Sequence, residues 1–120
     1  MVNKSLNYGR HIIADFAGKI GRYENVLDIG AGKGDDLMIY KSKCESTKLL
    51  ALEGYEPNLS RLAERGIEVS SHNLEHDKFP FEDKSLDVVS ANQILEHVKE
   101  IFWIFHEIAR TLKIGGYFVL

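Results

Sequence analysis

The stretch VLDIGAGKGDD, residues 26 to 36, places a carboxylate and three closely spaced glycines directly after a short apolar run. Glycine-rich turns at the end of a strand commonly bind phosphate, because backbone N–H groups point at the ligand and no Cβ holds it away. Asp28 stands at the mouth of this turn, where its charge would repel a phosphate. The turn therefore suits a ligand with a positive group, which pyrophosphate lacks.

The spacing of the glycines also differs from that of a dinucleotide-binding turn. That turn reads GxGxxG, and its third glycine allows close packing of helix and strand. Gly30, Gly32 and Gly34 instead give GxGxG, with Asp35 three residues after Gly32. Taken alone this motif separates the two classes only weakly, so a nicotinamide-dependent oxidoreductase stays open as an alternative.

Polar residues follow the other apolar runs as well. Glu53 comes after KLLAL and can accept from both hydroxyls of a ribose, in charge-assisted hydrogen bonds worth roughly 1.5–3 kcal/mol each. Asn73 and Leu74 come after IEVSS, where an adenine edge would be read, and Asn92 follows LDVVS. The alternatives are structural: Asp28 could cap a turn, Glu53 could be a solvated loop acid and Asn73 could form a turn.

Strand-like and helix-like patterns alternate along the chain. Five apolar runs predict strands, at 25–29, 48–52, 67–71, 86–90 and 117–120, and intervening segments predict helices at 6–20, 35–43, from Pro57 to Gly66, and from Ile94 to Leu112. Uniformly apolar strands separated by helices predict an α/β fold, a doubly wound parallel sheet covered on both faces. Such sheets bind ligands beyond the carboxyl ends of their strands.

The segment from Ile94 to Leu112 has the strongest helical pattern in the chain. Its apolar residues recur every three or four positions and share one narrow sector, which predicts a single helix with one buried face. The sector holds Ile94, Val98, Ile101, Phe105, Ile108 and Leu112, and Leu95, Phe102 and Ala109 widen it. Trp103 falls almost opposite, among Lys99, Glu107 and Arg110. It is either a lone exposed aromatic shielded by those side chains or a contact with a partner or further segment.

The ordered set of motifs resembles one family. VLDIGAGKG, Glu53, NLEHDKFPFEDKSLDVVSANQILEHV and EIARTLKIGGYFVL, from about Asn25 to Leu120, are similar to class I S-adenosylmethionine-dependent methyltransferases, and most of all to the group labelled type 11. The resemblance implies a Rossmann-like sheet with strand order 3-2-1-4-5. Strands 6 and 7 of the family fold, which also supply much of the acceptor pocket, have no counterpart in this sequence.

The resemblance also implies the residues that bind S-adenosylmethionine: Asp28, Gly30, Ala31, Gly32, Gly34, Glu53, Gly54, Tyr55, Asn73, Leu74 and Asn92. Asp28, the glycine turn and Asn92 would hold the methionine end, with the aspartate near the ammonium group. Glu53 would bind the ribose, while Gly54, Tyr55 and the Leu74 backbone would contact adenine. Asn73 departs from the aspartate common in the family, although an amide carbonyl can still accept from the adenine amino group.

Methyl transfer from a sulfonium is an in-line displacement, so the protein must mainly align the acceptor and exclude water. His97 is the candidate base for an acceptor that must lose a proton, although it flanks the apolar helix face and a structural role is the alternative. We therefore expect a methyltransferase, or its cofactor-binding portion, acting on a small-molecule or glycan-like acceptor. The alternatives are a non-catalytic S-adenosylmethionine-binding or interaction module and, less in keeping with the turn, an NAD-dependent oxidoreductase.

Bulk properties restrict the setting. The 120 residues predict one domain, with a helical segment over 1–24 and a cofactor-binding core over 25–120. The net charge of −3 gives no basic surface for nucleic acid, no apolar run reaches membrane-spanning length, and the histidines share no metal-ligand spacing. The single cysteine favours a cytoplasmic location. The chain stops within its fifth strand, so it is either a fragment or a short protein whose apolar strand edge could self-associate.

Overall fold

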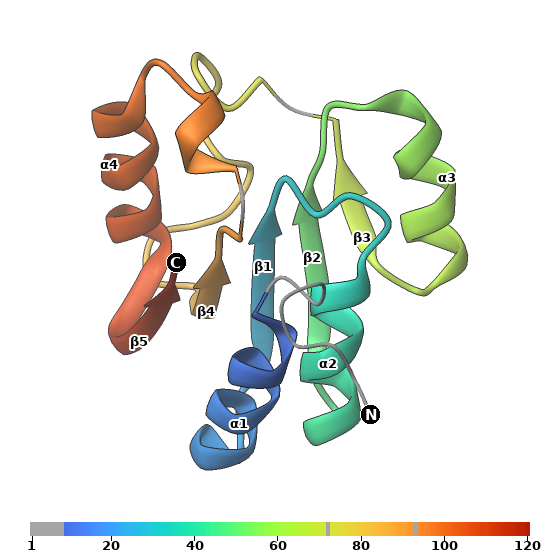
Figure 1. The fold of residues 1–120 in the computed structure, drawn as a ribbon. Coiled ribbons are helices and arrows are strands. Elements are labelled where there is room, and N and C mark those ends of the chain that lie inside the picture. The colour runs from blue at the N-terminus through green and yellow to red at the C-terminus, as the bar shows by residue number, and fades with distance from the viewer. Residues whose placement is uncertain (1–8, 72, 93) are drawn as a thin grey trace.

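Five parallel strands form the centre of the computed structural model, which describes residues 9–71, 73–92 and 94–120 (Figure 1). The strands are β1 (Asn25–Ile29), β2 (Lys48–Leu52), β3 (Glu68–Ser70), β4 (Leu86–Ser90) and β5 (Leu112–Val119). Their spatial order is β3-β2-β1-β4-β5, and every neighbouring pair runs parallel. This confirms the predicted α/β fold and its strand order.

Helices cover both faces of the sheet, as side-chain alternation along the strands requires. The helices are α1 (Arg10–Ile20), α2 (Asp35–Lys43), α3 (Glu56–Glu64) and α4 (Ile101–Thr111). Val26 and Val88 pack with residues of α1, α2 and α3, whereas Leu27 and Val89 pack with residues of α4 and the 74–81 loop. None of the helices in the described residues is long and apolar enough to cross a membrane.

The predicted helix from Ile94 to Leu112 is wrong at its start. Leu95–His97 form a 3₁₀ turn, Val98 is extended, and α4 begins only at Ile101. The Glu75 carboxylate accepts hydrogen bonds from the backbone N–H groups of Lys99 and Glu100. The acid binds the backbone of the N-cap residue Glu100 and of the residue before it, next to the positive end of the helix dipole, so a side chain distant in sequence fixes where the helix begins.

The buried face of α4 also differs from the predicted one. Ile104, Glu107, Ile108 and Thr111 are buried, whereas Phe102 is 85 % exposed. Glu107 can be buried because its charge is paired with Arg110 and its carboxylate accepts the Phe79 N–H. Trp103 is half-buried rather than exposed, and its indole N–H donates to the Asp77 carbonyl at 3.3 Å. The chain's own loop therefore provides a contact for this tryptophan.

β5 is longer than its sequence pattern predicts. It begins at Leu112, so the two glycines lie inside the strand rather than before it. The register shifts between Leu86 and Val88, and Gly115 has φ of +84°, a conformation that other residues rarely adopt. At the other end of the chain, α1 begins at Arg10, and the predicted helical residues 6–8 lie outside the described residues.

Candidate functional site

The loops that follow β1, β2, β3 and β4 lie at one end of the sheet, where their strands end (Figure 1). The glycine loop, residues 30–34, joins β1 to α2 and makes a tight path with positive φ angles. A Cβ on Gly34 would come within 2.7 Å of Ile67 and 2.9 Å of Leu62, so this glycine allows close packing against α3 and the start of β3. A Cβ on Gly32 would meet no atom of the described residues within 4 Å.

Glu53 stands at the end of β2 and holds the glycine loop from the side. Its carboxylate accepts hydrogen bonds from the backbone N–H groups of Gly32 at 2.6 Å, Gly54 at 3.0 Å and Tyr55 at 3.1 Å. The Asn58 amide adds a longer contact of 3.4 Å. The structure therefore brings Glu53 to the glycine loop, with its carboxylate held by backbone donors of both segments. Its predicted role in binding a ribose stays a prediction.

Two cavities flank the glycine loop and share Gly30. The Glu53 cleft has a volume of about 600 Å³ and is lined by Gly30, Leu52, Glu53, Gly54, Ser71, Asn73, Leu74, Glu75, Asp77, Ile94 and Val98. The Arg10 pocket has a volume of about 340 Å³ and is lined by Arg10, Gly30, Ala31, Gly32, Lys33, Asp35, Asp36 and Asn92. The Glu53 cleft therefore combines apolar side chains with three acids, whereas the Arg10 pocket combines acids with bases.

Sequence reasoning missed Arg10 and Asp36, which shape the Arg10 pocket. The Arg10 Nε donates to Asp36 Oδ1 at 2.9 Å, and the Asn92 amide donates to Asp36 Oδ2 at 3.1 Å. A second guanidinium nitrogen of Arg10 lies 3.6 Å from Asp35. Helix α1 packs on α2 and brings Arg10 there, so the Arg10–Asp36 pair cannot be read from any local motif. The two consecutive acids after the glycines, Asp35 and Asp36, were the available sequence signal.

Asp28 lies in β1, two residues before the glycine loop, and is only 3 % exposed. Burial, followed by the charges of Asp36 and Glu53, raises the pKa of Asp28 well above its ordinary value. The positive charge of Arg10 and a hydrogen bond from the Ile29 backbone oppose this shift. The described residues that line the two cavities do not include Asp28, so it acts on them through its charge and packing.

Of the remaining predicted residues, some line the Glu53 cleft and others lie outside both cavities. Asn73 and Leu74 line the Glu53 cleft, where the Asn73 side-chain carbonyl accepts the Glu75 N–H at 3.0 Å. Tyr55 is 64 % exposed and is not part of the described lining of either cavity. His97 lies in the 3₁₀ turn with its side chain 71 % exposed, 3.5 Å from Glu96, and outside the lining of both cavities.

The arrangement suits a ligand with two chemically different ends. An amino-acid tail carries one ammonium and one carboxylate, and the Arg10 pocket offers Asp36 for the first and Arg10 or Lys33 for the second. A nucleoside needs apolar contact and acceptors for its hydroxyls, which Leu52, Ile94 and Glu53 provide. Among the described residues, no group of three or more His, Cys, Asp or Glu side chains is arranged to hold a metal ion.

A family model described as "Methyltransferase domain" matches residues 27–120. This segment begins inside β1 and includes the glycine loop, Glu53 and every later strand, so it carries most of the site. Arg10 and helix α1 lie before it.

Individual proteins show the same likeness. The methyltransferase YcgJ of Bacillus subtilis is 32 % identical over 102 residues, covering 79 % of this chain and 39 % of YcgJ. A ubiquinone/menaquinone biosynthesis C-methyltransferase of Xylella fastidiosa is 27 % identical over 114 residues, covering 89 % of this chain and 44 % of that protein. The crystal structure of an S-adenosylmethionine-dependent methyltransferase from Mesorhizobium loti has the same fold, with a TM-score of 0.78 at 18 % identity over 95 % of this chain and 53 % of that one. The chain thus spans less than half the length of these two curated relatives.

Proposed function

The chain belongs to the type 11 family of methyltransferase domains, and we propose that its glycine loop and the two cavities beside it bind S-adenosylmethionine for transfer of the methyl group to a small-molecule acceptor. The observation that carries this proposal is the placement of the glycine loop. Gly30 lines both cavities and Gly32 lines the Arg10 pocket, so the loop joins a pocket with paired acids and bases to a cleft that has carboxylates beside apolar side chains. S-adenosylmethionine has an amino-acid tail that matches the charged pocket and a nucleoside that matches the cleft.

The residues of the chain would divide the cofactor between them. Arg10 and Asp36 would hold the amino-acid tail, Glu53 the ribose hydroxyls, and Leu74 with Ile94 the adenine side of the Glu53 cleft. When bound, the cofactor supplies a methyl group already activated on a sulfonium. The chain's own task is then to orient that group and exclude water, because a displacement of this kind needs alignment more than acid–base help.

We propose a small-molecule or glycan-like acceptor. A relative whose name assigns it to quinone biosynthesis supports the small-molecule part of this proposal. The described lining of the two cavities contains no histidine, so His97 would serve as a base only if the acceptor brought that segment to the reacting centre. The free thiol of Cys44 is compatible with a reducing compartment such as the cytoplasm.

Calorimetric titration with S-adenosylhomocysteine, NAD and adenosine tests the proposed cofactor. We expect S-adenosylhomocysteine to bind, adenosine to bind more weakly because it leaves the Arg10 pocket empty, and NAD not to bind. The difference between the first two ligands measures the contribution of the amino-acid tail. Binding of NAD without binding of S-adenosylhomocysteine would contradict the proposal and favour a dinucleotide enzyme.

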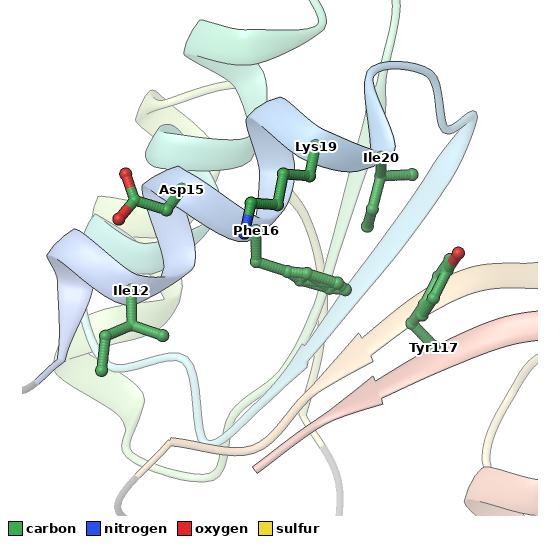
Figure 2. Close-up of a pocket in the computed structure, with 6 residues that line it drawn as sticks. All are labelled: Ile12, Asp15, Phe16, Lys19, Ile20 and Tyr117. Atoms are coloured by element: carbon green, nitrogen blue, oxygen red, sulfur yellow. The ribbon is translucent and has the colours of Figure 1, made fainter.

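A specific surface supports a further, interaction role. Among the described strands β5 forms one edge of the sheet, and Ile114 and Tyr117 on it are 88 % and 49 % exposed. Between β5 and α1 lies a groove of about 420 Å³, in which Phe16 and Tyr117 meet edge to face at 5.2 Å (Figure 2). Edge strands of this kind pair readily with other chains. Asp15 and Lys19 flank the same groove, so two copies related by a two-fold axis could pair these opposite charges.

We therefore expect the chain to dimerise through the β5 edge as its concentration rises. Sedimentation equilibrium over a range of concentrations measures this association. Tyr117→Lys should shift the equilibrium to the monomer, because it places a charge in the groove. Tyr55→Lys is the matched control, since Tyr55 is equally an exposed tyrosine but precedes α3. A monomer at every concentration would rule out this surface as a self-association site.

A further inference from the structure

Three polar side chains are buried together behind the glycine loop. Asp28 in β1 and Ser90 in β4 are direct neighbours across the sheet, and both lie on the face that α2 covers, the side of Val26 and Val88. Tyr40 of α2 packs on the same face. Asp28 is 3 % exposed and the other two are fully buried, so water does not solvate this group from the surface.

The hydrogen bonding of this group is incomplete. The Ser90 side chain neighbours the Tyr40 hydroxyl, but the geometry falls short of a hydrogen bond. Within the described residues, neither hydroxyl forms a hydrogen bond with the Asp28 carboxylate or with any other group. A buried carboxylate keeps its charge when several donors point at it, and here two nearby hydroxyls do not. The Ile29 backbone donates to Asp28, but burial and the neighbouring acids outweigh this bond and disfavour the charged form.

Two negative charges near Asp28 raise its pKa, and one positive charge opposes them. Asp36 of α2 and Glu53 after β2 are negative, and Arg10 of α1 is the positive group that faces Asp28, although its guanidinium is already bonded to Asp36. From β4 the neighbour is the neutral Ser90. Tyr40 stays neutral as well, because burial first, and the charges of Asp28 and Asp36, raise its pKa far above the ordinary value. A proton in this cluster therefore resides on Asp28.

We propose that Asp28 is protonated in the ligand-free chain and gives its proton to solvent when the ammonium group of the cofactor tail enters the Arg10 pocket. The inference rests on the proposed function and adds a proton balance to it. One O–H bond of the Asp28 carboxyl breaks, the proton goes to the buffer, and the charge of the buried carboxylate that remains is balanced by the ammonium charge in the neighbouring pocket. An opposite charge nearby favours the ionised form of a carboxyl, so binding and ionisation are coupled.

Calorimetry in buffers with different ionisation enthalpies counts the protons released on binding. Titration of the full chain with S-adenosylhomocysteine over a range of pH should release part of a proton at pH values between the pKa of Asp28 in the bound chain and its raised pKa in the free chain, with affinity rising as pH rises through that range. Adenosine, which lacks the ammonium group, should release none. Asp28→Asn should abolish the release, whereas Tyr40→Phe should keep it, since the tyrosine does not supply the proton.

Equal proton counts for S-adenosylhomocysteine and adenosine, or a release that persists in Asp28→Asn, would overturn the inference while leaving cofactor binding intact. Failure of both ligands to bind would instead overturn the proposed function and this inference with it.

A measurement without ligand provides an independent check. A folded-state pKa above the unfolded value of about 3.9 means that wild-type stability falls as pH rises through this range, because the unfolded chain loses the proton more easily. Asp28→Asn cannot ionise, so its stability relative to the wild type should grow with pH in urea unfolding. If the difference in free energy of unfolding between Asp28→Asn and the wild type stays constant from acid to neutral pH, Asp28 is charged in the ligand-free fold.

Discussion

Replacing Arg110 with methionine is expected to lower the free energy of unfolding by about 3–5 kcal/mol, because it leaves the charge of Glu107 buried without its partner. The Glu107 side chain is 1 % exposed and that of Arg110 is 14 % exposed. Arg110 Nε donates to Glu107 Oε2 at 2.9 Å and a terminal nitrogen donates to Oε1 at 3.0 Å. A two-pronged pair of this kind is among the stronger ionic contacts in proteins.

The same guanidinium holds the loop before β4. It donates to the carbonyl groups of Phe79 at 3.0 Å and Phe81 at 2.9 Å, and to the Asp83 carboxylate at 2.8 Å. Glu107 completes the connection by accepting the Phe79 N–H at 2.8 Å. Phe79 itself is 1 % exposed and packs in the core on the α4 side. Loss of Arg110 therefore removes hydrogen bonds from a loop whose aromatic residue is part of the core.

Urea unfolding of a set of variants separates the loss of the pair from the loss of one charge. Arg110→Met alone should be the least stable, and Glu107→Leu combined with Arg110→Met should recover much of the stability, because the uncompensated charge is gone. Lys48→Met is the matched control: its ion pair with Glu68 spans 3.3 Å, but both side chains are more than half exposed. An exposed pair contributes about 0–1 kcal/mol. Equal losses in Arg110→Met and Lys48→Met would contradict the buried-pair account.

The pH dependence of stability follows from the same contacts. Burial pushes the pKa of Glu107 upward, but hydrogen bonds from Arg110 and Phe79 outweigh it and leave the pKa below its ordinary value. A lowered folded-state pKa means that this contribution is complete above the unfolded value of about 4.3 and is lost as pH falls through the folded value. In Arg110→Met the sign should reverse, because the isolated Glu107 would gain stability by taking up a proton.

The strands were predictable because each buried one is a short, uniformly apolar run. β1, β2 and β4 have the bounds that the sequence predicts, since NVLDI, KLLAL and LDVVS have no plausible competing periodicity. The helix from Ile94 failed because its boundary depends on Glu75, whose carboxylate reaches it from another loop. The burial of Glu107 was equally hidden, since a charged residue is placed inside only by partners that the pattern does not contain.

The site likewise contains residues that the sequence predicts and residues that it does not. Gly32 and Glu53 lie where strand ends predict them, because parallel strands bring their carboxyl ends to one edge of the sheet. Arg10 could not be predicted, since its approach to Asp36 depends on how α1 packs against α2. The placement of Tyr55 outside the described cavity lining was hidden as well, because a motif fixes backbone position but not the direction of an exposed side chain.

Replacing Glu53 with alanine is expected to weaken binding of S-adenosylhomocysteine about ten-fold or more, since one charge-assisted hydrogen bond to a ribose hydroxyl is worth roughly 1.5–3 kcal/mol. Calorimetry measures the change. Glu56→Ala is the matched control, because Glu56 is an exposed acid three residues further along the chain, at the start of α3, and is outside the lining of the Glu53 cleft. It should bind the ligand as the wild type does.

Glu53 also holds the backbone of the glycine loop, so alanine could weaken binding by loosening that loop instead. A ligand analogue without the two ribose hydroxyls separates the two causes, because a double-mutant cycle isolates the contact between two groups. If Glu53 binds the ribose, the analogue should lose affinity for the wild type and little for Glu53→Ala, which has no carboxylate to lose. If the analogue loses the same factor with both proteins, the role of Glu53 is to hold Gly32 and its neighbours, and the ribose is bound elsewhere in the cleft.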